Sequence, residues 1–276
     1  MHEKRSHIFG GFSGETWPAL SLPEAEVLGA VMAFSVRAGG HSPQPFDSLN
    51  LSGSEGDTAA NVRRNLAVFS EAVGIDPERI VFAHQIHEDR IQLVTSPRSD
   101  PQEADAMIAA EPGVFVAVKT ADCLHILLLD PERQVIAVVH AGWKGTVLRI
   151  TRKVLRRLTL EFGTDPADLL VALGPVIGPC CYTVDETVIV PFQQAFPCPE
   201  RFLKSSGSAA TLGRGPGYYR MDIPGANRFE LMAQGVREIN IHDVGLCTAC
   251  NPELFFSHRR DRGLTGRHIA VVGFRG

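Results

Sequence analysis

Residues 123–140 read CLHILLLDPERQVIAVVH, and this stretch decides how we expect the chain to fold. Two apolar segments, Leu124–Asp130 and Val135–Val139, flank a short turn, which is the pattern of a β-hairpin. In such a hairpin Cys123 and His140 return roughly opposite each other, where cross-strand Cβ atoms lie about 4.5–5.5 Å apart. The sequence therefore predicts a rigid apolar hairpin that presents a thiolate and an imidazole. These are either metal ligands or a nucleophile and its base.

The composition is that of an ordinary globular protein. The chain has 276 residues, of which 44% are hydrophobic and 21% are charged. A net charge of -4, from 27 basic and 31 acidic side chains, offers no basic surface for nucleic acid or membrane. The N-terminus lacks the apolar core of a signal peptide, and no run approaches the roughly 18 apolar residues of a membrane span. We expect a cytoplasmic protein that acts on small molecules as a monomer or small homo-oligomer.

The alternation of elements predicts an α+β fold. Strand and helix patterns mix without a regular βαβ rhythm, which favours a single layered domain of mixed, largely antiparallel sheets flanked by helices. One helix is expected to begin with Asp57 as its N-cap and to end at Gly74. A long amphipathic helix with an apolar face from Val147 to Leu158 is expected after His140.

The composition along the chain sets the expected domain boundaries. Residues 1–30 are rich in Gly and Pro and are expected to form an irregular extension, as an arm or an added edge strand. Residues 31–276 are expected to form the catalytic domain. Residues 204–217, KSSGSAATLGRGPG, have linker-like composition and predict a loop within that domain.

The six cysteines are expected to be reduced thiols in a chain of this size and compartment. Cys247 and Cys250 have C-x-x-C spacing, but a structural zinc site needs a second pair and none stands nearby in the sequence. The adjacent Cys180 and Cys181 are expected to contribute at most one ligand to a metal. Cys181 is a candidate for the wall of a substrate pocket.

His87 is the upstream residue that we attach to the hairpin. With Cys123 and His140 it makes a plausible three-ligand zinc site whose fourth tetrahedral position is open to water or substrate. Zinc there would lower the pKa of a bound water or polarise a departing group. The spacing alone is weak, because His87 and Cys123 are 36 positions apart, which fits no short metal motif. Three unrelated, partly buried residues remain the alternative.

Three short stretches closely resemble the signatures of the YfiH-like family, also called the laccase-domain or polyphenol oxidase family. They are Gln85-Ile86-His87, Thr120-Ala121-Asp122-Cys123 and His140-Ala141-Gly142-Trp143-Lys144-Gly145. The resemblance covers about residues 31–274 in order. It continues through FDSLNL at 46–51, GP at 174–175, GPCCY at 178–182, CT at 247–248, and FFSHRR at 255–260 with TGR at 265–267.

The resemblance implies that His87, Cys123 and His140 bind one zinc ion. It also implies purine nucleoside phosphorylase activity, with adenosine deamination and methylthioadenosine phosphorolysis as related reactions. Purine nucleosides and phosphate are then the expected partners. Phosphate requires cationic or backbone N–H donors. The candidates for this role are Arg37, Arg64, Arg259 and Arg267.

Further substrate contacts are expected from Asn50, Asp105, His125 and Arg259, through the resemblance and through their hydrogen-bonding capacity. The chain departs from the family pattern at two places. It has Arg64-Asn65 where members often have Asn-Arg, which puts the phosphate role of Arg64 in doubt. It also has His258 where members often have tyrosine, and this change alters the pocket wall or adds a proton carrier.

Three other functions compete with the zinc phosphorylase. A copper-dependent polyphenol oxidase (laccase) follows from the family's other name, but four-copper oxidases use about ten histidines, largely as His-x-His pairs. This chain has 10 histidines in all and no such pair, so copper is the less favoured metal. A metal-free thiol hydrolase or deamidase would use Cys123 as nucleophile and His140 as base. The last alternative is a non-enzymatic metal-bound module.

Overall fold

The computed structural model describes residues 18–205 and 218–276. Residues 1–17, and most of the loop predicted at 204–217, lie outside the described residues. Within the described ranges no helix is long and apolar enough to cross a membrane.

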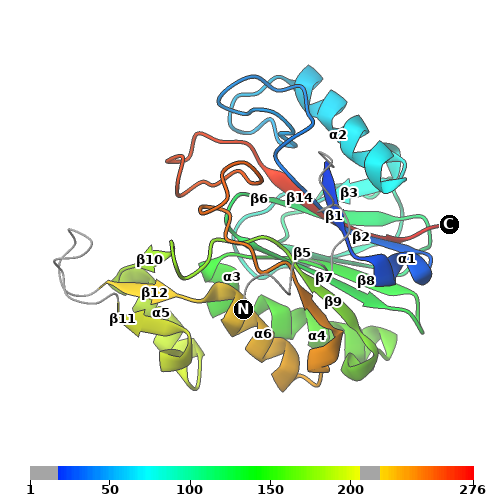
Figure 1. Cartoon of the computed structure of the whole chain (residues 1–276). Helices are drawn as coiled ribbons and strands as arrows, with labels where there is room; N and C mark the ends of the chain where they lie inside the picture. The colour runs from blue at the N-terminus through cyan, green and yellow to red at the C-terminus, as the bar shows by residue number, and fades with distance from the viewer. Residues whose placement is uncertain (1–17, 206–217) are drawn as a thin grey trace.

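The described strands form two large sheets and one small sheet (Figure 1). The five-stranded sheet has the order β1 (Ala19–Ser21), β2 (Ala30–Ser35), β14 (His268–Phe274), β6 (Phe115–Thr120), β3 (Ile80–Phe82). The six-stranded sheet has the order β13 (Ile241–Asp243), β9 (Leu170–Leu173), β7 (Leu124–Asp130), β8 (Val135–Ala141), β5 (Ala106–Ala109), β4 (Ile91–Val94). The small sheet joins β10 (Thr183–Val184), β12 (Tyr219–Met221) and β11 (Leu203–Ser205).

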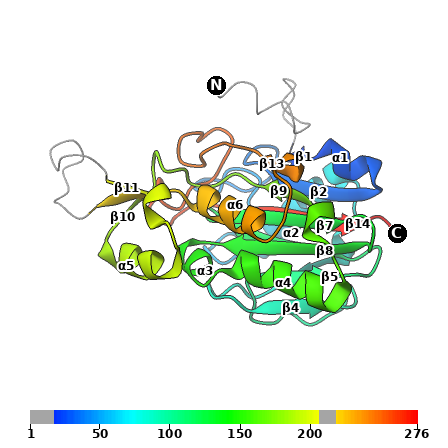
Figure 2. The same ribbon diagram turned by 90° about the horizontal axis from the view of Figure 1, so that it is seen from below.

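Helices cover the outer faces of the two large sheets, which pack on each other through a shared apolar core. α2 (Ala59–Val73) lies on the five-stranded sheet, and α4 (Ile150–Phe162) and α6 (Ile223–Ala233) lie on the six-stranded sheet (Figure 2). α5 (Glu186–Ala195) lies beside the small sheet at one end of the molecule. Most pairs among the described strands are antiparallel, and three are parallel. The predicted layered α+β fold with largely antiparallel sheets is confirmed.

The hairpin β7–β8 forms where the sequence predicts it, at the centre of the six-stranded sheet. Ile126 and Leu128 face the helices, whereas Leu127 and Leu129 face the other sheet. Both faces of the strand are therefore covered, and this explains a continuous apolar run where a half-exposed strand would alternate. Each such side chain contributes about 1.5–3 kcal/mol when it is fully buried.

Two helix predictions are wrong in detail. The N-cap of α2 is Thr58, whose hydroxyl accepts the N–H of Asn61 at 3.2 Å, while Asp57 accepts the N–H of Thr58 itself. The long helix expected after His140 is two helices, α3 (Trp143–Val147) and α4, because Arg149 adopts a left-handed conformation with φ of 59° between them.

The end of the expected N-terminal extension carries regular structure. β1 pairs antiparallel with β2 at the edge of the five-stranded sheet, and the short helix α1 (Pro23–Val27) connects them. Ala19, Leu20 and Leu22 are buried in the body. These residues therefore close one edge of the domain.

Candidate active site

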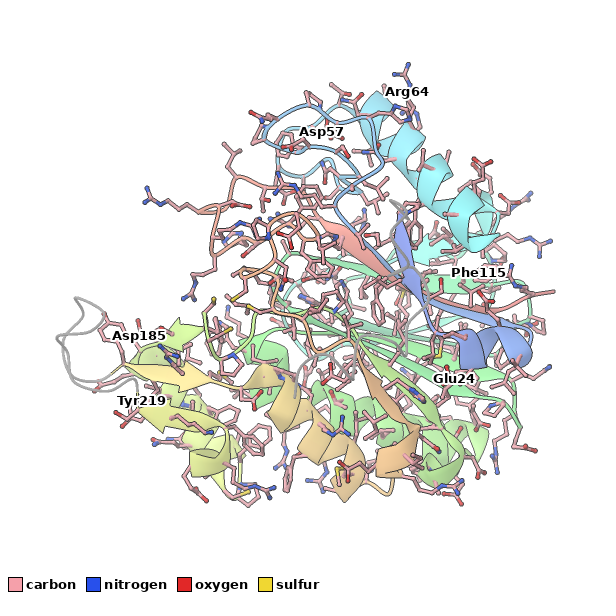
Figure 3. All side chains as sticks on the ribbon, viewed as in Figure 1. Glu24, Asp57, Arg64, Phe115, Asp185 and Tyr219 are labelled. Carbon is pink, nitrogen blue, oxygen red and sulfur yellow. The ribbon has the colours of Figure 1, made fainter. Side chains whose placement is uncertain are left out.

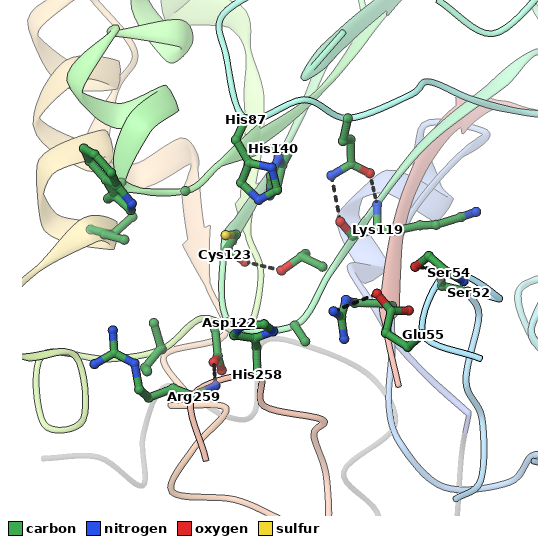
Figure 4. Close-up of a pocket in the computed structure, with 18 of the residues that line it drawn as sticks. Ser52, Ser54, Glu55, His87, Lys119, Asp122, Cys123, His140, His258 and Arg259 are labelled. Atoms are coloured by element: carbon green, nitrogen blue, oxygen red, sulfur yellow. Dashed lines mark hydrogen bonds and ion pairs between the residues drawn. The ribbon is translucent and has the colours of Figure 1, made fainter. Parts of the chain in front are cut away.

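His87, Cys123 and His140 meet at one end of the two large sheets. His87 lies in the loop between β3 and β4, Cys123 directly precedes β7, and His140 lies in β8. Their ligand atoms all lie within 4.8 Å of one another. The rings of the two histidines meet edge to face, with 4.9 Å between their centroids (Figure 4). The structure thus brings together the three residues that the sequence singled out.

The register of the hairpin differs from the expected one. His140 pairs with His125, and Leu124 pairs with Ala141, so Cys123 lies beyond the last pair and next to Gly142. A Cβ atom on Gly142 would lie 2.9 Å from the Cys123 sulfur. Because this contact is closer than real Cβ atoms approach, the missing side chain of Gly142 lets the thiol enter the site.

Asp105 holds two of the three residues in place from behind. Its carboxylate accepts the backbone N–H groups of Ile86, His87 and Glu88 at 3.2, 3.0 and 2.8 Å. These bonds fix a loop in which His87 has a φ of 58°. The same carboxylate lies 2.8 Å from Nδ1 of His140. That bond leaves Nε2 of His140 as the nitrogen available to an ion, which is the usual arrangement of a ligating histidine and its carboxylate partner.

The electrostatics of the three groups favour an ionised thiol. Burial would raise the pKa of Cys123, but the charge of His140 and hydrogen bonds from both histidines lower it to about 6. Burial would lower the pKa of His140, but the Cys123 thiolate and Asp105 raise it to about 9. In the metal-free protein the pair is therefore thiolate and imidazolium at neutral pH.

The donor set fits a metal ion. Two imidazoles and one thiolate are ligands that zinc prefers, and three protein ligands are typical of catalytic zinc sites. His140 is 3% exposed and its carboxylate partner is fully buried, which limits their motion, while the His87 side is open. A fourth ligand would come from the cavity beside His87, Cys123 and His140, the three residues called the metal triplet below.

This cavity has a volume of about 540 Å³, within the usual range for small-molecule sites. One wall is apolar and partly aromatic, and contains Trp143, Ile177, Tyr182 and Ile223. Lys119, Ser52, Ser54 and Glu55 lie on one side of the metal triplet, and Asp122, His258 and Arg259 lie on another (Figure 4). The remaining lining residues are Ala83, His84, Gln85, Thr120, Ala121, Gly142 and Arg267.

Of the predicted substrate contacts, Arg259 lines the cavity. Its backbone N–H donates to Asp122 at 2.6 Å, and its guanidinium donates to the Thr183 carbonyl at 2.9 Å and lies over the Tyr182 ring. Arg267 also lines the cavity, but its guanidinium pairs with Glu55 at 2.8 Å.

The other predicted contacts are not among the described residues that line the cavity. Arg64 is exposed on α2 and points away from the body (Figure 3). Arg37 forms an ion pair with Asp47 at 3.0 Å. Asn50 is fully buried, where its amide donates to Asp57 and to the Ser52 carbonyl.

Three predicted contacts lie behind the site or beside it. Asp105 supports the metal triplet as described above. His125 pairs with His140 in the hairpin, is 2% exposed and packs against Phe34. Cys181 lies in a separate group of cysteines.

Lys119 is a cavity residue that was not predicted from the sequence. It is the one charged residue of strand β6, where it follows four apolar residues, and that isolation was the available signal. Its ammonium lies 4.6 Å from the centre of the Phe82 ring and enters no ion pair within the described residues. Burial lowers the pKa of Lys119, and the charge of Glu55 partly offsets this effect.

Comparison with known proteins identifies the family. The family model described as "Multi-copper polyphenol oxidoreductase laccase" matches residues 31–275. The chain is 37% identical to the purine nucleoside phosphorylase YlmD of Geobacillus stearothermophilus over 90% of this chain and 91% of that protein. It is 33% identical to the Bacillus subtilis protein of the same name, over 95% and 93%.

Solved structures agree with this result. The crystal structure of YlmD from Geobacillus stearothermophilus superposes with a TM-score of 0.87 at 35% identity, covering 98% of this chain and 99% of that one. The Bacillus licheniformis protein YfiH superposes with a TM-score of 0.86 at 32% identity, covering 94% and 97%. The predicted resemblance is confirmed, and the chain belongs to the YfiH-like family of laccase-domain proteins.

Proposed function

We propose that this protein is a zinc-dependent purine nucleoside phosphorylase that also deaminates adenosine. The proposal depends above all on one observation. His87, Cys123 and His140 converge on a cavity that has an apolar, aromatic wall and three cationic side chains, Lys119, Arg259 and Arg267. The names of the relatives support the same activity, because several are purine nucleoside phosphorylases.

The apolar wall suits a purine base. Trp143 and Tyr182 offer aromatic surfaces, and Ile177 and Ile223 extend them. Aromatic rings bind flat heterocycles by stacking without requiring a particular base. Adenosine, inosine, guanosine and methylthioadenosine are therefore the proposed substrates.

Lys119 is the proposed phosphate ligand. Phosphorolysis forms a bond between a phosphate oxygen and C1' of the ribose and breaks the bond from C1' to the purine nitrogen. A dianionic nucleophile must be held beside the sugar, which requires a charged donor. Within the described residues the Lys119 ammonium enters no ion pair, whereas Arg267 is paired with Glu55 and the Arg259 guanidinium donates to the Thr183 carbonyl. The neighbouring Ser52 and Ser54 add hydroxyl donors.

His87, Cys123 and His140 would hold the zinc ion, with Asp105 fixing the two histidines. When bound, zinc supplies a Lewis acid at its open fourth position. The chain's own residues bind the base, orient the phosphate and keep the ligands in place. Deamination of adenosine would use the same base-binding wall, with water as co-reactant and ammonia as the second product.

A nucleoside panel tests the proposal. Adenosine, inosine, guanosine and methylthioadenosine are incubated with zinc-verified protein, with and without inorganic phosphate, and the products are identified by mass spectrometry. We expect free base and ribose 1-phosphate only when phosphate is present, and inosine from adenosine in either case. Absence of base release from all the nucleosides would contradict the phosphorylase, and absence of inosine would contradict the deaminase alone.

The metal-free thiol hydrolase remains the second candidate, because Cys123 and His140 form a thiolate and imidazolium pair in the metal-free state. Alkylation separates the two functions. A zinc ligand is protected from iodoacetamide until the metal is removed, whereas a nucleophilic thiolate is alkylated in the active enzyme. Each sample is assayed after the iodoacetamide is quenched and zinc is added back. Loss of activity only in the sample that was alkylated after chelator treatment supports the zinc site, and loss in the sample alkylated without chelator supports the nucleophile. Metal analysis of the same sample identifies zinc or copper.

A further inference from the structure

Four cysteines gather outside the cavity described above. The sulfur atoms of Cys180, Cys181, Cys247 and Cys250 all lie within 4.8 Å of one another. None of the four lines the cavity, and all are free thiols. No second pair stands near Cys247 and Cys250 in the sequence, but Cys180 and Cys181, roughly 70 residues away along the chain, supply one in the folded structure.

The sheet topology explains why these two segments meet. β9 and β13 are parallel neighbours, so the loops that follow them leave the same edge of the sheet (Figure 2). The pairing continues beyond the strands through a bridge between Val176 and Cys247. Val176 donates to the Leu246 carbonyl at 3.3 Å and accepts the N–H of Thr248 at 3.1 Å. The backbone itself therefore fixes the distance between the two cysteine pairs.

The sulfur spacing suits a tetrahedral ion. The Cys250 sulfur lies 3.6 Å from that of Cys180 and 3.3 Å from that of Cys181. Four thiolates around one zinc ion, with zinc–sulfur distances near 2.3 Å, stand about 3.8 Å apart. A disulfide would instead require about 2.05 Å. The two adjacent cysteines both direct their sulfurs to the same point, although the sequence analysis expected at most one of them to do so.

Backbone N–H groups point at one of the sulfurs. Gly178 donates its N–H to the Cys247 sulfur at 3.3 Å, and the backbone of Cys250 donates to the same atom. Such donors stabilise a thiolate and hence a metal ligand. A Cβ atom on Gly178 would lie 3.2 Å from the Cys180 sulfur and 3.4 Å from the Cys247 Cβ. The glycine thus makes the space in which the two loops close on each other.

We propose that Cys180, Cys181, Cys247 and Cys250 bind one zinc ion as a structural tetrathiolate site, separate from the His87, Cys123 and His140 site. Four protein ligands leave no open position, so this ion takes no part in chemistry. Two of the sulfurs belong to exposed residues, which gives the ion a path of entry.

The site would join two loops that carry cavity residues. The first loop contributes Ile177 and Tyr182, and the second leads to Arg259. Both loops also hold Asp122, the residue before the zinc ligand Cys123. The hydroxyl of Thr248 donates to its carboxylate at 2.5 Å, and the N–H of Ile177 donates to its carbonyl at 2.9 Å. A zinc ion at the four cysteines would therefore stabilise one side of the cavity.

Metal content of cysteine variants tests this site. Zinc per chain is measured by mass spectrometry of aerobically purified wild-type protein and of the variants Cys180→Ser, Cys250→Ser and Cys198→Ser. We expect Cys180→Ser and Cys250→Ser each to hold one zinc equivalent less than the wild type. Cys198→Ser, which changes a partly buried cysteine outside the cluster, should lose none. Equal zinc in all four proteins would overturn the proposal.

A second measurement uses the wild-type chain alone, so that it does not depend on how the variants fold. Protein stripped of metal and reconstituted with cobalt should bind two equivalents and show a thiolate-to-cobalt absorption far stronger than one cysteine ligand gives. A single cobalt equivalent with weak thiolate absorption would contradict the site. So would iron in place of zinc, or a disulfide between Cys181 and Cys250 found by non-reducing peptide mapping.

Discussion

Asp105 shows how much a single buried side chain organises. Its two oxygens accept three backbone N–H groups of the His87 loop and contact Nδ1 of His140. Burial would raise the pKa of this carboxyl, but the bonds from His140 and the loop hold it below its usual value. A permanent negative charge therefore stands behind two of the three proposed zinc ligands.

We expect Asp105→Asn to weaken zinc binding about 10–100-fold, because an amide cannot accept all of these bonds or supply the charge. Competition with a chromophoric chelator measures the change. Asp130→Asn is the matched control, since Asp130 is also fully buried but lies at the turn end of the hairpin. Equal zinc affinity in wild type and Asp105→Asn would show that Asp105 is dispensable for the site.

Lys119 carries the proposed phosphate contact, so its removal should affect one substrate and spare the other. A charge-assisted hydrogen bond contributes about 1.5–3 kcal/mol, so Lys119→Met should raise the KM for phosphate roughly ten- to hundredfold and leave that for inosine nearly unchanged. Steady-state kinetics with either substrate varied gives both values. Lys153→Met, at an exposed ion pair with Asp89, is the control. An unchanged KM for phosphate would remove Lys119 from this role.

The junction between the hairpin and α3 positions the sulfur of Cys123, one of the three proposed metal ligands. A Cβ atom on Gly142 would lie 2.9 Å from the Cys123 sulfur, whereas one on Gly145 would meet its nearest atoms at 3.4 Å. Gly142→Ala should therefore displace the sulfur and weaken zinc binding by about tenfold or more, the effect that 1.4 kcal/mol produces. Gly145→Ala should bind zinc like the wild type. Equal affinities in both variants would show that the junction tolerates a side chain.

The elements also show what the sequence could predict. The hairpin was predictable because two apolar runs joined by a turn are a local signal. The end of α2 was predictable because the glycine at position 74 is a local stop signal. The break at Arg149 was not, since a left-handed arginine has no sequence signature. β13 was not predicted, because three residues are too few to show the alternation of apolar and polar side chains that indicates a strand. Its parallel pairing with β9, which brings the two cysteine pairs together, was therefore not predicted either.

The candidate site was predictable where the family signatures carry it. The residues of the metal triplet come from segments far apart in sequence. Their spacing alone did not distinguish a metal site from a nucleophile with its base or from three unrelated residues. Substrate contacts were harder to predict, because a polar side chain can bond either to a ligand or to the protein itself. Asn50 and Arg37 bond to the protein. Their hydrogen bonds to the chain become visible only once the loops are placed.

For the whole molecule, the buried His268 makes the folded state less stable in acid. Burial lowers the pKa of His268 to about 3, and the charges of Arg37 and Arg267 act in the same direction. The unfolded chain, with a pKa near 6.5, therefore binds the proton more tightly than the folded protein does. The contribution of His268 to the free energy of unfolding is therefore fully present above pH 6.5. It is lost progressively as the pH falls from 6.5 toward 3.

The free energy of unfolding should then fall by about 1.4 kcal/mol per pH unit for this histidine alone once the pH is below 6. Urea unfolding at a series of pH values measures it. His268→Gln retains an acceptor for the N–H of Phe256, which His268 accepts at 2.8 Å, but has no proton to bind. Its unfolding free energy should depend less steeply on pH than that of the wild type. Identical slopes would contradict the assignment.

Nucleoside phosphorolysis should depend on zinc held by His87, Cys123 and His140. The most direct measurement compares wild type and Cys123→Ser for zinc per chain and for ribose 1-phosphate formed from inosine and phosphate. We predict one zinc equivalent less in the variant, and loss of the product that added zinc does not restore. Wild-type product formation by a variant that lacks this zinc would contradict the claim.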